Sequence, residues 1–130
     1  MRKLRILVAD DEEGIRESLK LILEGEYELV FARQGEETLA KLTRERFDLA
    51  LLDIKMPKLD GLEVLKQMKQ QRLATPVIIL TAYQSVELAK EAIKLGALDY
   101  LPKPFTRDQI LDAIRDAVAP VPGKSERKAN

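Results

Sequence analysis

Short apolar runs alternate along the chain with stretches whose apolar residues recur at helical spacing. The first and fourth runs, 6–9 and 77–80, are apolar without interruption, which is typical of strands covered on both faces. Further strands are predicted at 27–32, 47–52 and 100–101. The pattern therefore predicts five short strands separated by longer amphipathic segments.

Between these runs, apolar residues return every three or four positions, which predicts five helices. The stripes consist of Ile15, Leu19, Ile22 and Leu23; Leu39 and Leu42; Leu62, Leu65 and Met68; Val86, Ala89 and Ile93; and Ile110, Leu111, Ile114 and Val118. Gly25 and Gly96 are expected to end the first and fourth helices. Thr106, followed three positions later by Gln109, matches a capping box at the start of the last helix.

Strand and helix alternate five times, which predicts an α/β fold with a parallel sheet and helices on both faces. For five strands, the doubly wound order 2-1-3-4-5 of flavodoxin-like (βα)5 proteins fits best. This domain is expected to cover residues 1–119. The Pro-, Gly- and Ser-containing segment 120–130 is expected to be a tail or the start of a linker.

Composition narrows the chemistry that this fold can perform. The 130 residues include neither cysteine nor histidine, so the chain has no thiol nucleophile, zinc–thiolate centre, imidazole base or histidine-ligated metal. The 22 basic and 22 acidic residues balance, which argues against direct binding of nucleic acid or an acidic membrane surface. No apolar run approaches the roughly 20 residues of a membrane span, and we expect a cytoplasmic protein.

Reactive side chains follow four of the five predicted strands. Asp10 and Asp11 follow the first strand, Asp53 the third, Thr81 the fourth and Lys103 the fifth. The carboxyl ends of parallel strands meet at one sheet edge, where ligands of such folds bind. Clustered carboxylates favour a hard cation such as Mg²⁺, with Mn²⁺ as the alternative. A carboxylate can also attack phosphorus to form an aspartyl phosphate, whose charge a cation, an ammonium and a hydroxyl can neutralise.

The chain resembles the receiver (CheY-like) domain of two-component response regulators from about Leu4 to Val118. The resemblance rests on Asp10-Asp11, on segment 51–61 with its sequence LLDIKMPKLDG, on Thr81-Ala82, and on segment 100–105 with its sequence YLPKPF. These four motifs occur in this order, each at the end of a predicted strand. Segments 51–61 and 96–105 look similar to receivers of enhancer-binding (NtrC-like) transcriptional activators.

The resemblance implies a role for each residue of the acidic cluster. Asp53 would accept the phosphoryl group. Asp10 and Asp11 would hold Mg²⁺ together with Asp53 and the backbone carbonyl of Lys55. Lys103 would pair with the phosphoryl oxygens, and the peptide bond that follows it is expected to be cis.

The resemblance also implies a switch and its partners. Thr81 would donate its hydroxyl to the phosphoryl group and move on activation, and Tyr100 would change its ring position with it. The donor would be a sensor histidine kinase or a histidine phosphotransfer protein. The output, and a homodimer contact, would lie on the face formed by the fourth helix, the fifth strand and the fifth helix. Such a protein is a switch and not an enzyme, apart from its own phosphoryl transfer and slow autodephosphorylation.

Four further residues lie close in the sequence to the predicted site residues. Lys55 and Tyr83 lie two positions after Asp53 and Thr81, and we expect both to flank the site and to slow attack by water on the phosphorylated state. Glu12 and Glu13 are interpreted as first-turn charges that the helix dipole favours.

Three other functions compete with the phosphorylation switch. A phosphohydrolase of the haloacid dehalogenase type would carry a second aspartate where Lys55 stands. A flavin-binding module would place a phosphate loop after the first strand, where the acidic Asp10-Asp11-Glu12-Glu13 stands instead. The remaining alternative is a receiver-like module that binds proteins without being phosphorylated.

Overall fold

Five parallel strands form a single sheet in a computed structural model that describes residues 3–119. The strands are β1 (Leu4–Ala9), β2 (Tyr27–Ala32), β3 (Leu49–Leu52), β4 (Val77–Thr81) and β5 (Asp99–Pro102). Their order across the sheet is β2-β1-β3-β4-β5. This confirms the predicted fold class and strand order. The expected tail, 120–130, lies outside the described residues, and the boundary at residue 119 stays a prediction.

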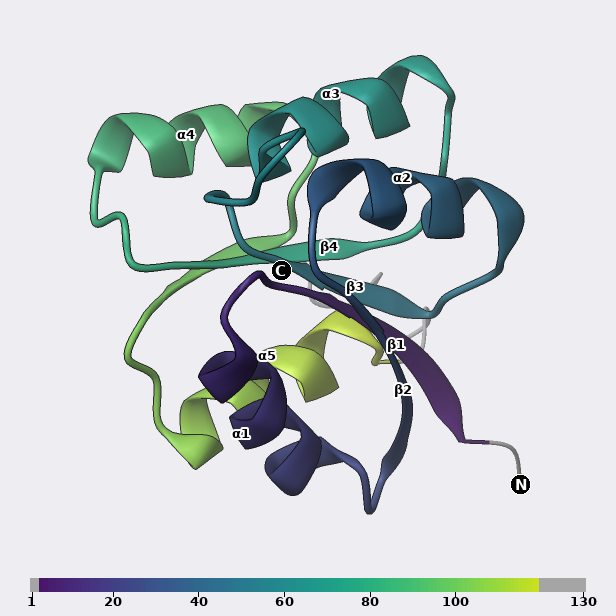
Figure 1. Cartoon of the computed structure of the whole chain (residues 1–130). Coiled ribbons are helices and arrows are strands. Elements are labelled where there is room, and N and C mark those ends of the chain that lie inside the picture. The colour runs from purple at the N-terminus through teal and green to yellow at the C-terminus, as the bar shows by residue number, and fades with distance from the viewer. Residues whose placement is uncertain (1–2, 120–130) are drawn as a thin grey trace.

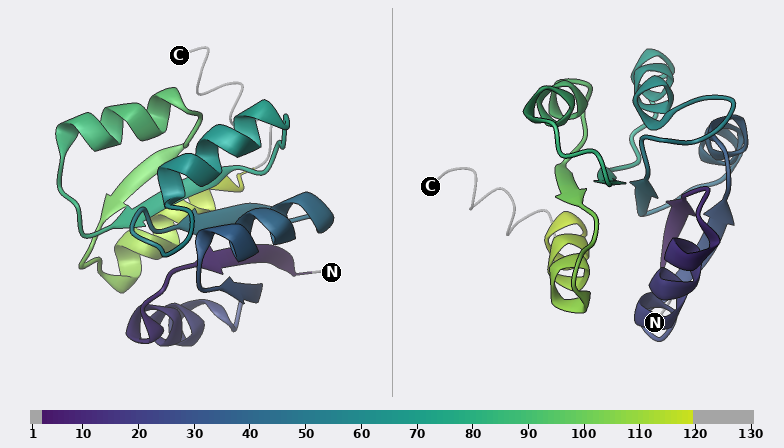
Figure 2. Two further views of the ribbon diagram at one scale, coloured as in Figure 1. Left: turned by 45° about the horizontal axis from the view of Figure 1, so that its top comes forward. Right: turned by 60° about the vertical axis from the view of Figure 1, so that its left-hand side comes forward.

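Five helices cover the two faces of this sheet. They are α1 (Glu13–Leu23), α2 (Gly35–Arg44), α3 (Gly61–Gln70), α4 (Val86–Lys94) and α5 (Arg107–Ala117). Figure 1 shows α1 and α5 on one face and α2, α3 and α4 on the other. The two further views in Figure 2 show the same three layers. None of the helices within residues 3–119 is long and apolar enough to cross a membrane.

The alternation of side chains along β1 divides the core into two layers. Ile6 and Val8 pack in the layer under α1 and α5, whereas Leu7 and Ala9 pack in the layer under α2, α3 and α4. All four residues are at most 1% exposed. Because successive side chains of a strand point to opposite faces, a strand covered on both faces must be apolar at every position.

Two elements differ in detail from the sequence prediction. β3 begins at Leu49 and not at residue 47. Phe47 is buried in the core beside the sheet, and the guanidinium of Arg5 lies 4.8 Å from its ring centroid. In α4, Val86 and Ile93 of the predicted stripe are 64% and 49% exposed. The residues of this region that face the core are Leu88, Ala92 and Leu95.

Capping explains where several helices begin and end. The predicted capping box of α5 is present: Gln109 N donates to Thr106 Oγ1 at 3.1 Å, and Thr106 N donates to Gln109 Oε1 at 2.8 Å. Asp60 caps α3 by accepting from Glu63 N at 2.9 Å. After α4, Gly96 takes a φ of 109°, which glycine adopts without the steric penalty that other residues meet.

Candidate functional site

Backbone hydrogen bonds of the sheet hold the site residues at one edge. Asp10 N donates to Ala32 O at 3.0 Å, Asp53 N to Ala9 O at 2.9 Å and Lys103 N to Thr81 O at 2.9 Å. These bonds continue the strand pairing by one residue beyond the strands. The reactive side chains therefore start from a rigid frame, as expected for the carboxyl ends of parallel strands.

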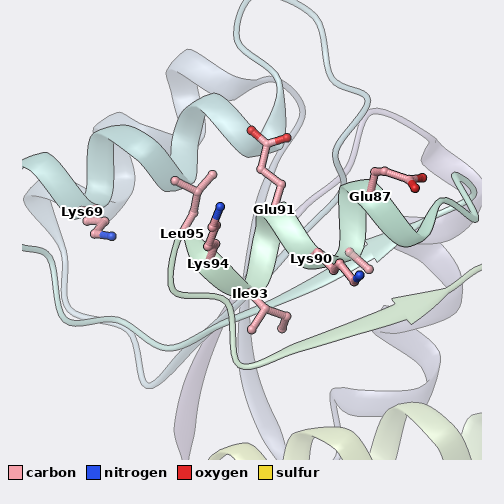
Figure 3. Close-up of a pocket in the computed structure, with 8 residues that line it drawn as sticks. Lys69, Glu87, Lys90, Glu91, Ile93, Lys94 and Leu95 are labelled. Carbon is pink, nitrogen blue, oxygen red and sulfur yellow. The ribbon is translucent and has the colours of Figure 1, made fainter.

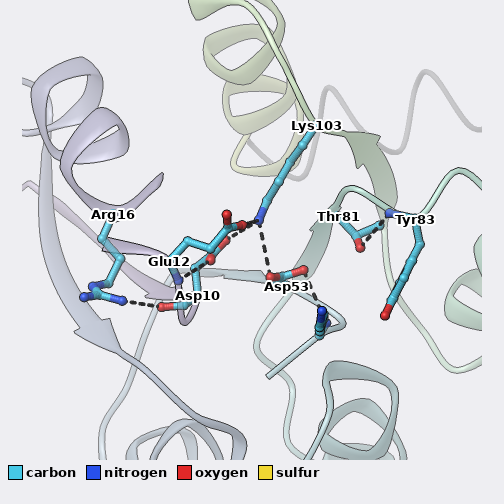
Figure 4. A network of polar contacts seen from close by, with 8 residues as sticks. Asp10, Glu12, Arg16, Asp53, Thr81, Tyr83 and Lys103 are labelled. Carbon is cyan, nitrogen blue, oxygen red and sulfur yellow. Dashed lines mark hydrogen bonds and ion pairs between the residues drawn. The ribbon is translucent and has the colours of Figure 1, made fainter. Parts of the chain in front are cut away.

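Lys103 lies at the centre of the site and joins three carboxylates. Its Nζ lies 2.7 Å from Asp10 Oδ2, 3.0 Å from Glu12 Oε1 and 3.3 Å from Asp53 Oδ2 (Figure 4). An ammonium has three N–H donors, so these contacts occupy all of them. The Lys103 side chain is only 7% exposed, and its ion pairs with Asp10 and Asp53 are therefore little screened by solvent.

Three aspartates form a cluster of oxygen ligands beside this ammonium. One carboxylate oxygen from each of Asp10, Asp11 and Asp53 lies within 4.8 Å of the others. Asp10 and Asp53 are buried, whereas Asp11 is exposed. An all-oxygen set that is open to water on one side is the kind of site that suits Mg²⁺, which keeps several water ligands. The predicted acidic group is thus assembled by the fold.

The buried charges shift one another's protonation. Burial raises the pKa of Asp10, and the hydrogen bond from Lys103 opposes that rise. Burial also raises the pKa of Asp53, and the negative charge of Asp10 raises it further. Burial alone would lower the pKa of Lys103, but the hydrogen bond to Asp10 and the nearby carboxylates outweigh it and raise that pKa. Lys103 therefore stays charged, whereas burial makes negative charge on Asp10 and Asp53 costly.

A close backbone approach fixes the loop that carries Lys55. Gly61 N donates to Ile54 O at 2.8 Å, and Lys55 N donates to Asp53 Oδ1 at 3.3 Å. A Cβ atom on Gly61 would lie 2.4 Å from the backbone oxygen of Asp53, a distance that no side chain tolerates. Glycine is therefore required where the start of α3 packs against the end of β3.

Thr81 and Tyr100 both contact the loop that follows β4. Thr81 is 1% exposed, and its Oγ1 accepts from Tyr83 N at 3.2 Å. The Tyr100 hydroxyl donates to Tyr83 O at 2.5 Å. The side chain of Tyr83 stands at the rim of the site (Figure 4). One residue of this loop thus connects the predicted hydroxyl donor to the predicted switch tyrosine.

These side chains surround a pocket of about 310 Å³. Its lining consists of Asp11, Glu12, Asp53, Lys55, Thr81, Ala82, Tyr83 and Lys103. Lys55 and Tyr83 line the pocket, as predicted for residues that flank the site. The Lys103–Pro104 bond is cis, as expected.

The contacts of Glu12 and Arg16 are not predicted by the sequence pattern. Glu12 is more than a first-turn charge: it occupies the N-cap position of α1 without capping it, and it pairs with Lys103 instead. Arg16 Nη1 donates to the backbone oxygen of Asp10 at 2.8 Å. Nothing in the spacing of Glu12 and Lys103, 91 positions apart, indicates this pair. Glu13 does lie exposed in the first turn of α1.

A larger hollow of about 1070 Å³ runs along α4 (Figure 3). It is lined by Lys69, Glu87, Ala89, Lys90, Glu91, Ile93, Lys94 and Leu95. It shares no lining residue with the carboxylate pocket, and its lysines and glutamates carry mixed charge. Size alone therefore does not identify the site, and the acidic cluster at the sheet edge is the better candidate.

The chain matches the response regulator receiver domain family over residues 6–115, and it belongs to that family. The transcriptional regulatory protein ZraR of Salmonella typhimurium is 41% identical over 118 residues, which cover 90% of this chain and 27% of ZraR. Sporulation initiation phosphotransferase F of Bacillus subtilis is 42% identical over 116 residues, which cover 88% of this chain and 94% of that protein. The chain thus spans about a quarter of one relative and nearly all of the other.

Solved structures agree with this assignment. The crystal structure of a response regulator receiver domain protein (CheY-like) from Methanospirillum hungatei has a TM-score of 0.85 and 35% identity, covering 99% of this chain and 100% of that one. The receiver domain of the Francisella response regulator 1452 has a TM-score of 0.84 and 35% identity, with 89% and 97% coverage. The strand order of this chain and its similarity to these receiver structures confirm the predicted flavodoxin-like fold.

Membership of this family carries general properties. Receiver domains act in two-component signal transduction as phosphoryl acceptors, bind Mg²⁺ at an acidic pocket and interact with histidine kinases or phosphotransfer proteins. They are generally not enzymes in the ordinary sense.

Proposed function

We propose that this chain is a Mg²⁺-dependent phosphorylation switch whose acceptor is Asp53. The observation that carries the proposal is the position of Asp53, which is buried at the end of β3, 3.3 Å from the Lys103 ammonium and within one oxygen cluster with Asp10 and Asp11. A buried carboxylate surrounded by cation ligands and one ammonium suits a group that receives negative charge.

The transfer is a substitution at phosphorus. A carboxylate oxygen of Asp53 forms the new P–O bond while the P–N bond of a phosphohistidine donor breaks, and the leaving imidazole takes up a proton from solvent. Mg²⁺, when bound, neutralises charge that develops on the phosphoryl oxygens. Asp10, Asp11, Asp53 and the backbone carbonyl of Lys55 would hold it. Manganese would fit the same ligands.

Lys103 and Thr81 would receive the transferred group. The ammonium is already aimed at Asp53 Oδ2, so its charge is available to the new phosphoryl oxygens with little rearrangement. The Thr81 hydroxyl accepts only from Tyr83 N among the hydrogen bonds of the described residues, and its proton is free to be donated. Such a donation draws Thr81 toward Asp53 and changes its relation to Tyr83.

The output surface would be the face of α4, β5 and α5. The hydrogen bond between Tyr100 and Tyr83 connects β5 to the loop before α4, which gives a movement of Thr81 a route to this face. Val86, Ile93 and Leu98 are large apolar residues left 64%, 49% and 51% exposed in this region. Exposed apolar side chains of this kind favour a protein partner, and a homodimer through this face is part of the proposal.

The remaining features of the proposal come from sequence and family. The receiver domain would cover residues 1–119, with 120–130 as tail or linker. The donor would be a sensor histidine kinase or a histidine phosphotransfer protein in the cytoplasm, with no direct contact between this domain and nucleic acid or membrane. Lys55 and Tyr83 line the pocket and would slow attack by water on the aspartyl phosphate. Transcriptional output of the NtrC-like type is the proposal for any attached domain.

Intact-mass analysis after incubation with acetyl phosphate and Mg²⁺ tests the proposal. Wild type should gain one phosphoryl group, and the gain should disappear when Mg²⁺ is chelated beforehand. Asp53→Asn should gain none, whereas Asp60→Asn, which changes an exposed aspartate that caps α3, should behave as wild type. If wild type gains nothing even with a phosphoramidate donor, the phosphorylation-independent binding module becomes the better explanation.

A further inference from the structure

The side chain of Glu12 contacts Lys103 on the other side of the site and does not cap its own helix. It occupies the N-cap position of α1, yet it makes no capping hydrogen bond. Its Oε1 instead accepts from Lys103 Nζ at 3.0 Å, and Figure 4 shows the side chain directed toward that ammonium. The backbone of Glu12 is also tied to the site, because its N–H donates to Asp10 Oδ1 at 2.9 Å.

The three donors of Lys103 are fully used by Asp10, Glu12 and Asp53. A phosphoryl group on Asp53 brings further oxygens that need the same donors, so one existing partner has to withdraw. Phosphorylation removes the carboxylate charge of Asp53, whose contact with Lys103 passes to a phosphoryl oxygen, so the other phosphoryl oxygens compete with Asp10 and Glu12. Asp10 is buried, and its withdrawal would leave an unpaired charge. Glu12 has a side chain that is 61% exposed, and water can replace Lys103 at its carboxylate. Glu12 is therefore the partner that leaves at the lowest cost.

We propose that Glu12 holds Lys103 in the unphosphorylated protein and competes with the phosphoryl group for it. The inference rests on the proposed function and deepens it. The Glu12 carboxylate lines the same pocket as Asp11 and Asp53, where its negative charge attracts a cation and opposes an anion. Glu12 is thus a positioning residue with two opposite effects: it favours Mg²⁺ binding and disfavours the phosphoryl group.

The test measures these two effects separately in Glu12→Gln. Calorimetry gives the affinity for Mg²⁺ alone, and fluorine NMR gives the affinity for beryllofluoride, a phosphoryl stand-in, at saturating Mg²⁺. Because the pair is partly exposed, we expect about a twofold to fivefold change in each affinity. Mg²⁺ binding should weaken, and beryllofluoride binding should tighten. A role that is only structural would move both affinities in the same direction.

Two variants isolate the contact from the charge. Glu13→Gln removes the same charge one residue further on, from an exposed side chain in the first turn of α1, and should leave beryllofluoride affinity unchanged. Glu12→Asp keeps the charge but shortens the side chain by one methylene group, which withdraws it from Lys103. It should keep the Mg²⁺ affinity of wild type and still bind beryllofluoride more tightly.

The outcomes separate this inference from the proposed function. If wild type binds neither Mg²⁺ nor beryllofluoride, the proposed function fails. If wild type binds both and Glu12→Gln matches Glu13→Gln, or loses affinity for both ligands, competition for Lys103 is refuted while the switch stands. Thermal melts of each variant verify that it is folded. If Glu12→Gln does not fold, the beryllofluoride affinity of Glu12→Asp decides between competition and a structural role.

Discussion

The hydroxyl of Tyr100 donates a hydrogen bond of 2.5 Å to the backbone carbonyl of Tyr83. The backbone N–H of Tyr83 donates to Thr81 Oγ1 at 3.2 Å. Both bonds use the main chain of Tyr83, so its peptide units form a continuous link from the buried hydroxyl of the site to β5. A movement of Thr81 toward Asp53 therefore acts directly on the strand that lies within the proposed output face.

Tyr100→Phe should uncouple the site from β5. One net hydrogen bond is worth about 0.5–1.5 kcal/mol, so the free energy of unfolding in urea should fall by no more than that. The chemical-shift response of β5 amides to beryllofluoride should shrink much more. Tyr83→Phe is the matched control, because its main chain retains both bonds. Equal β5 responses in Tyr100→Phe and wild type would show that the link carries no signal.

Asp53→Asn should stabilise the metal-free fold at neutral pH. Burial raises the pKa of Asp53 above that of an unfolded chain, so this group's stabilising contribution is complete below the unfolded pKa and is lost as pH rises through the folded pKa. Asparagine does not ionise, so the variant does not lose this stability as the pH rises. In chelator at pH 7 the variant should therefore unfold at a higher urea concentration than wild type.

Urea unfolding from pH 3 to pH 8 checks the sign of this effect. The difference between Asp53→Asn and wild type should vanish near pH 3 and grow toward neutrality, and Mg²⁺ should stabilise wild type more than the variant. Asp60→Asn keeps its N-cap function, since both residues cap well, and should show no such pH dependence. A variant less stable than wild type at pH 7 in chelator would contradict the argument.

Gly61→Ala should distort the site through the backbone. The added Cβ would lie 2.4 Å from Asp53 O, and relieving this clash should cost about 1–3 kcal/mol of stability and weaken Mg²⁺ binding. Gly14→Ala is the control, because a Cβ there meets nothing within 4 Å. It should stabilise α1 by about 0.4–1 kcal/mol. Urea unfolding measures the stability of both variants, and Mg²⁺ titration measures their affinity for the cation. If Gly61→Ala matches Gly14→Ala in both, the β3–α3 loop moves away from the added Cβ at no measurable cost.

The sequence predicted the fold and most of the site because both depend on local patterns. Uninterrupted apolar runs mark the strands, and Asp10, Asp53, Thr81 and Lys103 follow them at positions that any parallel sheet brings to one edge. What it could not predict depends on how long side chains extend in three dimensions. The reach of Glu12 to Lys103 is of this kind, because no periodicity connects a helix start to a distant loop.

The hydrophobic pattern also could not predict which side of α4 faces the core. Val86 and Ile93 have helical spacing, but Leu88, Ala92 and Leu95 form a competing stripe on the same helix and its end. The second stripe packs against the core, and Val86 and Ile93 are left exposed. Two apolar stripes on one helix give no local reason to choose between them. Packing against the rest of the fold makes the choice.

Lys55→Ala combined with Tyr83→Ala should shorten the lifetime of the phosphorylated state. Both side chains line the pocket beside Asp53, and Tyr83 is 44% exposed, so it stands between the site and bulk water. Removing both opens a path for the water that attacks phosphorus. We expect dephosphorylation to speed up on the order of threefold, which equals a barrier change of about 0.7 kcal/mol.

Loss of the phosphoryl group, followed by intact mass after removal of the donor, measures this rate. The single variants divide the effect between the ammonium and the ring. Lys58→Ala, which changes an exposed lysine in the same loop as Lys55, controls for a general loss of positive charge and should decay at the rate of wild type. If the double variant also decays at that rate, the lifetime is set by Asp53, Thr81 and Lys103 alone, since water then reaches the phosphorus equally well with or without the two flanking side chains.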